Sequence, residues 1–159
     1  MKISIGSDHG GIYLKKSLIG FMKKLDIEVI DRGTNSEESV DYPLFAEKVS
    51  VDVKDKNADY GILICKTGIG MSISANKISG IRAALVYSPK TGKLAREHNN
   101  ANVLCFGAGY IDFDSAKLAV KEFLSAEFEG NKPGGERHCR RIEEITSLEK
   151  KYRNNNQEE

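Results

Sequence analysis

The sequence alternates between short apolar runs and longer segments with a helical repeat, and this alternation limits the possible folds more than any other feature. Runs with the length and the Val and Ile content of buried strands lie at 3–6, 28–31, 60–65, 82–87 and 102–106. Helices between successive strands are typical of a parallel sheet that is covered on its faces. We therefore predict an α/β protein, a three-layer α/β/α sandwich with a Rossmann-like five-stranded parallel sheet.

The segments between these runs carry apolar residues every three or four positions, so one face of each predicted helix is buried. Such faces lie at 14–25, 45–53 and 116–124. A C-terminal helix is predicted from the same repeat at 142–152, after a Gly- and Pro-containing loop at 129–135. The length of 159 residues favours a single domain, predicted over 1–153, with a frayed tail at 154–159.

Charge and hydropathy exclude several classes of protein. Lys and Arg total 24 against 23 Asp and Glu, which gives +1, so a generally basic surface for nucleic acid or an anionic membrane is not expected. No stretch approaches the roughly 20 apolar residues of a membrane span, and the first residues lack a signal-peptide pattern. We expect a cytoplasmic protein. Its three cysteines, Cys65, Cys105 and Cys139, form no C-x-x-C pair, so neither a disulfide framework nor a cysteine zinc cage is predicted.

In a fold of this class, the loops that follow the strands line the ligand crevice. Asp8 and His9 follow the first predicted strand, where Asp8 either caps the next helix or contacts a ligand. Cys65 ends the third, and Gly68 and Gly70 then begin a helix whose N–H groups favour an anion. This loop is neither a P-loop nor a dinucleotide fingerprint, since it lacks G-K-[ST] and the last glycine.

Cys65 and Cys105 differ in where they lie in their predicted strands. A free cysteine is usually a small buried hydrophobe, and this is our interpretation of Cys105, which lies inside the fifth strand. Cys65 faces a helix N-terminus, a setting that favours a thiolate able to act as base or nucleophile. His98, near the end of the helix after the fourth strand, is either a helix cap or a proton donor. Arg137 and Arg141 lie four apart, on one helix face, as a solvated pair or a phosphate site.

The motifs also occur together in a characteristic order: Gly6–Gly11, Ser39–Pro43, Cys65–Gly70, Gly80–Ala83, His98–Asn99 and Arg137–Arg141. In combination they resemble ribose-5-phosphate isomerase B over almost the whole chain. The related galactose-6-phosphate isomerase subunits share the fold and some of the motifs. The resemblance implies metal-independent, cofactor-free interconversion of ribose 5-phosphate and ribulose 5-phosphate in the pentose phosphate pathway. It also implies a homodimer or homotetramer whose active sites are shared between subunits.

The resemblance further implies a role for each matching position. Cys65 is the implied base that moves a proton between C1 and C2, and His98 is the implied acid that opens the furanose ring. The remaining implied contacts are an enediolate cradle (Thr67 and the backbone of Gly68, Ile69, Gly70 and Met71), sugar contacts (Asp8, Tyr42 and Asn99) and phosphate ligands (His9, Arg137 and Arg141), some donated by the neighbouring subunit. The chemistry agrees, because a base beside a carbonyl is effective only where the enediolate is stabilised.

Two positions depart from the family pattern. Lys66 stands where the family commonly has glycine, and Gly109 stands where it often has a phosphate-binding arginine. We hypothesise that Lys66 supplies a cation near the substrate and partly offsets the missing arginine. Two alternative functions are left open at this point. One is a galactose-6-phosphate or other hexose-6-phosphate isomerase. The other is a non-catalytic module that binds sugar phosphate or resembles a receiver, although a receiver needs Asp at the place of Cys65.

Overall fold

The computed structural model describes residues 1–154 and contains a five-stranded sheet. All the strands are parallel, in the order β2-β1-β3-β5-β4. Their bounds are β1 Lys2–Ser7, β2 Glu28–Asp31, β3 Tyr60–Cys65, β4 Ala83–Val86 and β5 Val103–Gly107. The predicted α/β class and parallel sheet are confirmed, and each predicted strand is present with ends shifted by at most one residue.

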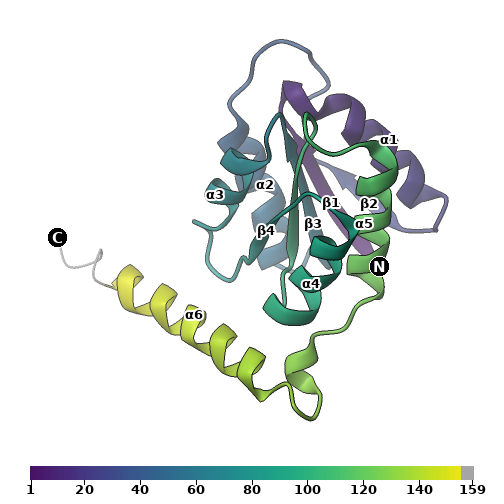
Figure 1. Cartoon of the computed structure of the whole chain (residues 1–159). Helices are drawn as coiled ribbons and strands as arrows, with labels where there is room; N and C mark the ends of the chain where they lie inside the picture. The colour runs from purple at the N-terminus through teal and green to yellow at the C-terminus, as the bar shows by residue number, and fades with distance from the viewer. Residues whose placement is uncertain (155–159) are drawn as a thin grey trace.

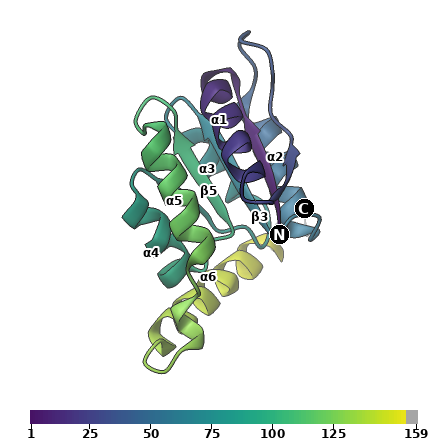
Figure 2. The same ribbon diagram turned by 90° about the vertical axis from the view of Figure 1, so that its right-hand side faces the viewer.

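Helices cover both faces of the sheet and form the two outer layers (Figures 1 and 2). One face packs against α1 (Ile12–Lys23), α4 (Pro89–Asn99) and α5 (Phe113–Ser125), and the other against α2 (Tyr42–Lys54) and α3 (Ile69–Ala75). Strand residues alternate between these layers: Ile62 and Ile64 join the first apolar cluster, whereas Leu63 joins the second. Both faces are therefore buried, which explains the continuous apolar runs in the sequence.

Two short 3-10 turns and a last helix complete the part of the chain that the structure describes. The turn η1 (His9–Gly11) follows β1, and η2 (Glu129–Asn131) precedes α6 (Glu136–Asn154). Figure 1 shows α6 running outward across the end of the molecule where the strands begin. Between α6 and the sheet layer lies a groove of about 950 Å³, lined by Arg82, Ile145 and Leu148 among others. Within residues 1–154, no helix has both the length and the apolar character needed to cross a membrane.

The strand order determines where a ligand crevice can form. From β1 the chain passes through α1 to β2 on one side, and then through α2 to β3 on the other side of β1. The loops that leave β1 and β3 therefore separate above the sheet, at the point where open α/β sheets bind ligands. Asp8 and Cys65 lie at this point, next to each other at the ends of paired strands.

Two charged networks inside the fold fix the long loop between β2 and α2. The fully buried Lys15 ammonium donates to both carboxylate oxygens of Asp31 at 2.8 and 2.9 Å, and to the carbonyl oxygen of Thr34. Arg32 donates two hydrogen bonds to Asp52, at 2.7 and 2.8 Å. These hydrogen bonds hold the pKa of Asp52 below its ordinary value, although burial of the carboxylate opposes them.

Some predicted boundaries are wrong. The first helix ends at Lys23 rather than reaching Leu25, which is 47% exposed because the chain turns towards β2. The helix α3 ends at Ala75, and the Asn76 side chain pairs with the backbone N–H and C=O of Ala83, which connects the helix end to β4. Asn154, expected in the frayed tail, is the last residue of α6, and the rest of that tail lies outside the described residues.

Candidate active site

Cys65 ends β3 with its side chain on the α2 and α3 side of the sheet, where it is 5% exposed. The backbone N–H of Gly68 donates to its sulfur, with an N···Sγ distance of 3.0 Å. A hydrogen bond donated to sulfur stabilises negative charge there, as does the positive end of α3. Cys105, one strand further, is completely buried, and burial raises its pKa far above the ordinary value. Both cysteines therefore lie in the same apolar layer, and Cys65 differs in accepting a backbone N–H at the end of its strand.

Close backbone packing gives the loop after Cys65 its shape. Gly68 has a φ of +78°, and a Cβ at this position would lie 2.8–2.9 Å from the backbone of Phe106 and Gly107. Thr67 accepts a hydrogen bond from the Ile69 N–H through its hydroxyl, at 3.2 Å. The loop is thus pressed onto the end of β5, with the Gly68 N–H turned towards the sulfur.

The first turn of α3 leaves backbone donors for an anion. Ser72 is the first residue whose N–H reaches back into this turn, to the carbonyl oxygen of Gly68. In the first turn of a helix, N–H groups such as those of Gly70 and Met71 have no intrahelical acceptor. These donors follow Cys65 by five and six residues and lie at the positive end of α3, a setting that favours an anion.

The loop after β1 meets the Cys65 loop directly. The Asp8 N–H donates to the Ile64 carbonyl at 3.2 Å, and the Asp8 carboxylate accepts from the Gly10 N–H at 2.9 Å. Asp8 is 6% exposed, and this burial raises the pKa of its carboxyl, although the Gly10 hydrogen bond opposes the shift. Asp8 therefore both caps η1 and lies beside Cys65. His9 is exposed and accepts the Val40 N–H on Nδ1 at 3.3 Å, which ties η1 to the loop before α2.

Tyr42 and Lys66 border the same crevice. A Cβ on Gly70 would lie 2.6 Å from the Tyr42 ring, so the ring covers the first turn of α3. A Cβ on Gly109 would lie 3.0 Å from Cε of Lys66, so the lysine stem lies over this glycine. Lys66 is exposed. It occupies the space above Gly109, which is the geometry required if its cation is to offset the missing arginine.

His98 and Asn99 lie at the opposite edge of the sheet. The helix α4 starts at the carboxyl end of β4, runs back along the sheet and ends at Asn99. The carbonyl oxygen of the next residue, Asn100, accepts a hydrogen bond from the side chain of Arg82, which lies just before the start of β4. Asn102 likewise accepts the Gly61 N–H at the start of β3. Four residues of strand, about 13 Å at about 3.3 Å each, separate Gly61 from Cys65. One chain therefore does not bring His98 to Cys65.

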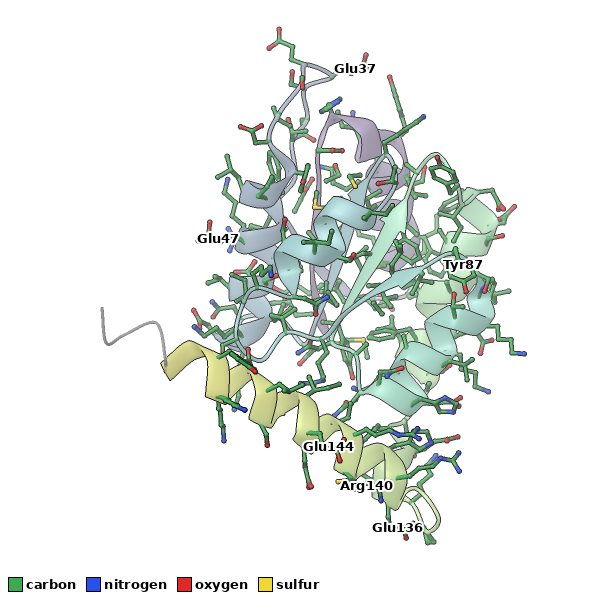
Figure 3. The ribbon with its side chains drawn as sticks, turned by 60° about the vertical axis from the view of Figure 1, so that its left-hand side comes forward. Glu37, Glu47, Tyr87, Glu136, Arg140 and Glu144 are labelled. Atoms are coloured by element: carbon green, nitrogen blue, oxygen red, sulfur yellow. The ribbon has the colours of Figure 1, made fainter. Side chains whose placement is uncertain are left out.

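Arg137 and Arg141 lie at that same edge. Both are exposed on the first turns of α6, four residues apart and hence on one face. In Figure 3 the neighbouring residues Glu136 and Arg140 lie at the end of the molecule opposite Glu37, which marks the loop between β2 and α2. The predicted site residues therefore form two separate groups, which we call the two half-sites. The first is formed by Asp8, His9, Tyr42, the Cys65 loop and the start of α3, and the second by His98, Asn99, Arg137 and Arg141.

The second half-site contains two residues that the sequence motifs do not mark as functional. The His138 ring stacks on the His98 ring, with centroids 4.5 Å apart, and Glu129 Oε2 lies 3.4 Å from His98 Nε2 and 3.7 Å from His138 Nε2. Burial, together with the charges of Arg137 and His98, lowers the pKa of His138. In the sequence, His138 stands out only as part of a basic run. Glu129 carries no signal, because it lies in a loop whose path the sequence does not define.

Comparison with known proteins identifies the family. The model of the Ribose/Galactose Isomerase family matches residues 3–145. The chain belongs to this family. Ribose-5-phosphate isomerase B of Escherichia coli (strain K12) is 43% identical over 150 residues, which is 94% of this chain and 97% of that protein. The predicted family resemblance is therefore confirmed, and the chain is a sugar phosphate isomerase of the ribose-5-phosphate isomerase B type.

Solved structures of relatives agree with the fold. Ribose-5-phosphate isomerase B of Clostridium thermocellum matches with a TM-score of 0.90 and 49% identity, over 96% of this chain and 99% of that chain. The Mycoplasma genitalium enzyme, solved with bound ribulose-5-phosphate, matches with a TM-score of 0.86 and 44% identity, over 94% of this chain and 96% of that chain. The family likeness thus extends through almost the entire described structure.

Proposed function

We propose that this protein interconverts ribose 5-phosphate and ribulose 5-phosphate by proton transfer through an enediolate, with Cys65 as the base. The observation that carries the proposal is the position of the Cys65 sulfur. It lies at the crevice of the sheet, accepts the Gly68 N–H at 3.0 Å, and is followed directly by the first turn of α3. The relative with bound ribulose-5-phosphate supports this choice of substrate.

The reaction assigns one task to each part of the first half-site. The Cys65 thiolate removes the proton from C2 of the open-chain aldose, and the charge moves onto the C1 oxygen. The N–H groups of Gly70 and Met71 stabilise this oxygen as it becomes negative. The proton of the C2 hydroxyl passes to the C1 oxygen, and the thiol returns its proton to C1 as the C2 carbonyl forms. Asp8 and Tyr42 contact the sugar on either side of the sulfur.

A second copy of the chain completes the site in this proposal. Ring opening requires a proton donor, for which imidazole is suited near neutral pH, and His98 lies at the other edge of its own sheet. The arginine pair at that edge provides two guanidinium groups for one phosphate. Exposed aromatic side chains lie beside the first half-site: Tyr87 and Tyr110, 68% and 75% exposed, line a hollow together with Thr67. Patches of this kind are typical of surfaces that another protein covers.

Lys66 supplies a cation at the first half-site, and His9 supplies a ring nitrogen that can contact the phosphate. The Lys66 stem lies over Gly109, while His9 is exposed at the start of η1. Together with Arg137 and Arg141 from the second copy, they make a basic site for a phosphate group. Such a site agrees with a chain whose net charge is only +1, because the cations are concentrated locally.

An isomerase assay with Cys65→Ala tests the proposal. We expect the wild-type protein to be active in EDTA and the variant to lose about 10²–10⁴-fold in kcat, the range of general acid–base catalysis. Cys139→Ala, a thiol on α6 that no step uses, is the matched control and retains activity. Full activity in Cys65→Ala would exclude the sulfur as base. Failure of the wild type in EDTA would exclude the metal-independent reaction. Faster turnover of a six-carbon phosphate would identify a hexose phosphate as the substrate.

A further inference from the structure

Three side chains from separate elements converge on one point at the second half-site. His98 comes from the end of α4, Glu129 from η2 and His138 from the first turns of α6. Their ligand atoms lie within 4.8 Å of one another. Glu129 Oε2 is 3.4 Å from one imidazole Nε2 and 3.7 Å from the other, and neither contact is a hydrogen bond. We call these three residues the His–Glu cluster.

His138 is the member of the cluster with an unsatisfied ring nitrogen. It is 4% exposed, and its Nε2 is buried without a hydrogen-bond partner. A buried polar atom without a partner costs about 1–3 kcal/mol. In most proteins such an atom is satisfied by a hydrogen bond to the protein, by an ordered water molecule or by a bound ion. Because this nitrogen is near a carboxylate oxygen and a second imidazole, it belongs to a set of atoms that ligates transition metals.

The distances from Glu129 Oε2 to the two imidazole nitrogens, 3.4 and 3.7 Å, fit a small divalent cation. Zinc binds His nitrogen and carboxylate oxygen at about 2.0–2.2 Å with tetrahedral geometry, so two of its ligand atoms lie about 3.4 Å apart. Two His and one Glu with an open fourth position form a common zinc ligand set. The imidazole planes are only 18° apart, so one ring must rotate to turn its nitrogen towards the ion. The His98 side chain is 38% exposed and is free to make this rotation.

The neighbouring charges also bear on this site. Arg137 and Arg141 lie close enough to His138 to lower its pKa, and they also repel a cation. Both arginines are exposed, so solvent and salt screen their charge, whereas the Glu129 carboxylate is a direct ligand. We propose that the His–Glu cluster binds a zinc ion through His98, Glu129 and His138. The ion is no part of the isomerase chemistry, because it lies on the proton donor rather than beside the base.

One consequence rests on the proposed function. A zinc ion bound to the nitrogen of His98 withholds that imidazole from proton transfer, so zinc inhibits the isomerase and a chelator reverses the inhibition. Folding would be affected as well, since the cluster joins α4, η2 and α6, and an ion that holds these elements together stabilises the folded state by mass action.

Binding of Zn²⁺ to the full chain tests the site without reference to activity. Titration calorimetry on metal-free protein is expected to show one Zn²⁺ per chain, and Co²⁺ in its place is expected to give the visible absorption of a tetrahedral site. Glu129→Gln keeps the shape of the side chain and removes the charged ligand, so its zinc affinity falls by more than about tenfold. His138→Ala falls likewise, and Glu129→Gln decides the matter if His138→Ala does not fold.

Matched control variants test whether other side chains of the protein bind the zinc ion. His9→Ala removes the one histidine outside the cluster, while Cys65→Ser and Cys139→Ser remove every thiol except the completely buried Cys105. All three variants are expected to bind Zn²⁺ as the wild type does. The proposal is overturned if the wild type binds no Zn²⁺, or if Glu129→Gln binds it with unchanged affinity. Zinc binding lost in Cys65→Ser would assign the ion to the catalytic thiol and equally overturn it.

The activity measurement separates this inference from the proposed function. If Zn²⁺ binds at the cluster and the protein has no isomerase activity, the proposed function fails and the zinc site stands. If the protein is an active isomerase and Zn²⁺ does not bind, the zinc site fails alone. Where both hold, the zinc concentration for half-inhibition rises in Glu129→Gln in step with its loss of zinc affinity.

Discussion

Replacing Gly68 with alanine disturbs the Cys65 loop at the point where it is most tightly held. At a φ of +78°, a side chain costs about 1–2 kcal/mol through left-handed strain. The added Cβ would also lie 2.8 Å from the carbonyl carbon of Phe106 and 2.9 Å from the nitrogen of Gly107. Backbone atoms of a central strand cannot move away as a flexible side chain does, so overpacking adds about 1–3 kcal/mol.

Gly80 provides the matched control. Its φ is +76°, and a Cβ there meets nothing within 4 Å, so Gly80→Ala has the strain without the clash. For a domain of this size, about 2–4 °C of Tm corresponds to 1 kcal/mol. Thermal unfolding is therefore expected to show a fall of about 2–8 °C for Gly80→Ala, and a further fall of about 2–12 °C for Gly68→Ala.

Activity distinguishes the two glycines more sharply. Moving the Gly68 N–H away from the Cys65 sulfur removes a hydrogen bond to a charged group, worth about 1.5–3 kcal/mol. At about 1.4 kcal/mol per factor of ten, kcat falls about ten- to hundredfold in Gly68→Ala and stays near the wild-type value in Gly80→Ala. If Gly68→Ala matched Gly80→Ala in both Tm and kcat, the loop would have no special part in holding the sulfur, and the reasoning would be refuted.

The remaining predictions concern charge and burial. Arg32→Ala leaves Asp52 buried without its main partner and lowers the free energy of unfolding at pH 7 by about 1–3 kcal/mol, as denaturant titration would show. Because Arg32 lowers the pKa of Asp52, this stabilisation exists above the ordinary value of 3.8 and disappears as the pH falls through the lowered pKa. The difference between the two proteins should therefore shrink in acid, and a constant difference would contradict the assignment. Lys66→Gly raises KM for the sugar phosphate several-fold, and an unchanged KM would place the lysine cation outside the phosphate site. Cys105, whose pKa is raised by burial, stays unmodified by a thiol alkylating reagent at neutral pH until the protein is unfolded, as mass spectrometry of its peptide would show.

Local patterns are sufficient to predict the elements of this fold. The run from Tyr60 to Cys65 is mostly apolar, and the strand it forms is buried on both faces of the sheet. Both of its predicted ends are therefore correct. Strand order is not predictable in the same way, because the chain passes β5 between β3 and β4, and that depends on packing between distant segments. Lys15 shows the same limit, since its helical position does not reveal that Asp31 and Thr34 bury its ammonium.

The candidate site is predictable as a set of residues and not as an arrangement. Cys65 and Asp8 lie together because they are at the ends of paired strands, and Tyr42 joins them because the start of α2 packs on the first turn of α3. His98 also follows a strand in the sequence, but a helix of eleven residues carries it back across the sheet. Glu129 becomes visible only when η2 brings it to the two imidazoles, since neither spacing nor composition marks it.

The proposed active site requires Cys65 of one copy to work with His98 of another. Mixing two inactive variants, Cys65→Ala and His98→Gln, under conditions that exchange subunits tests this requirement most directly. Each mixed dimer then contains one site with both wild-type residues, and random exchange gives about a quarter of the wild-type activity. A mixture that stays as inactive as its components, although co-purification of differently tagged copies shows that mixed dimers have formed, would contradict the shared site.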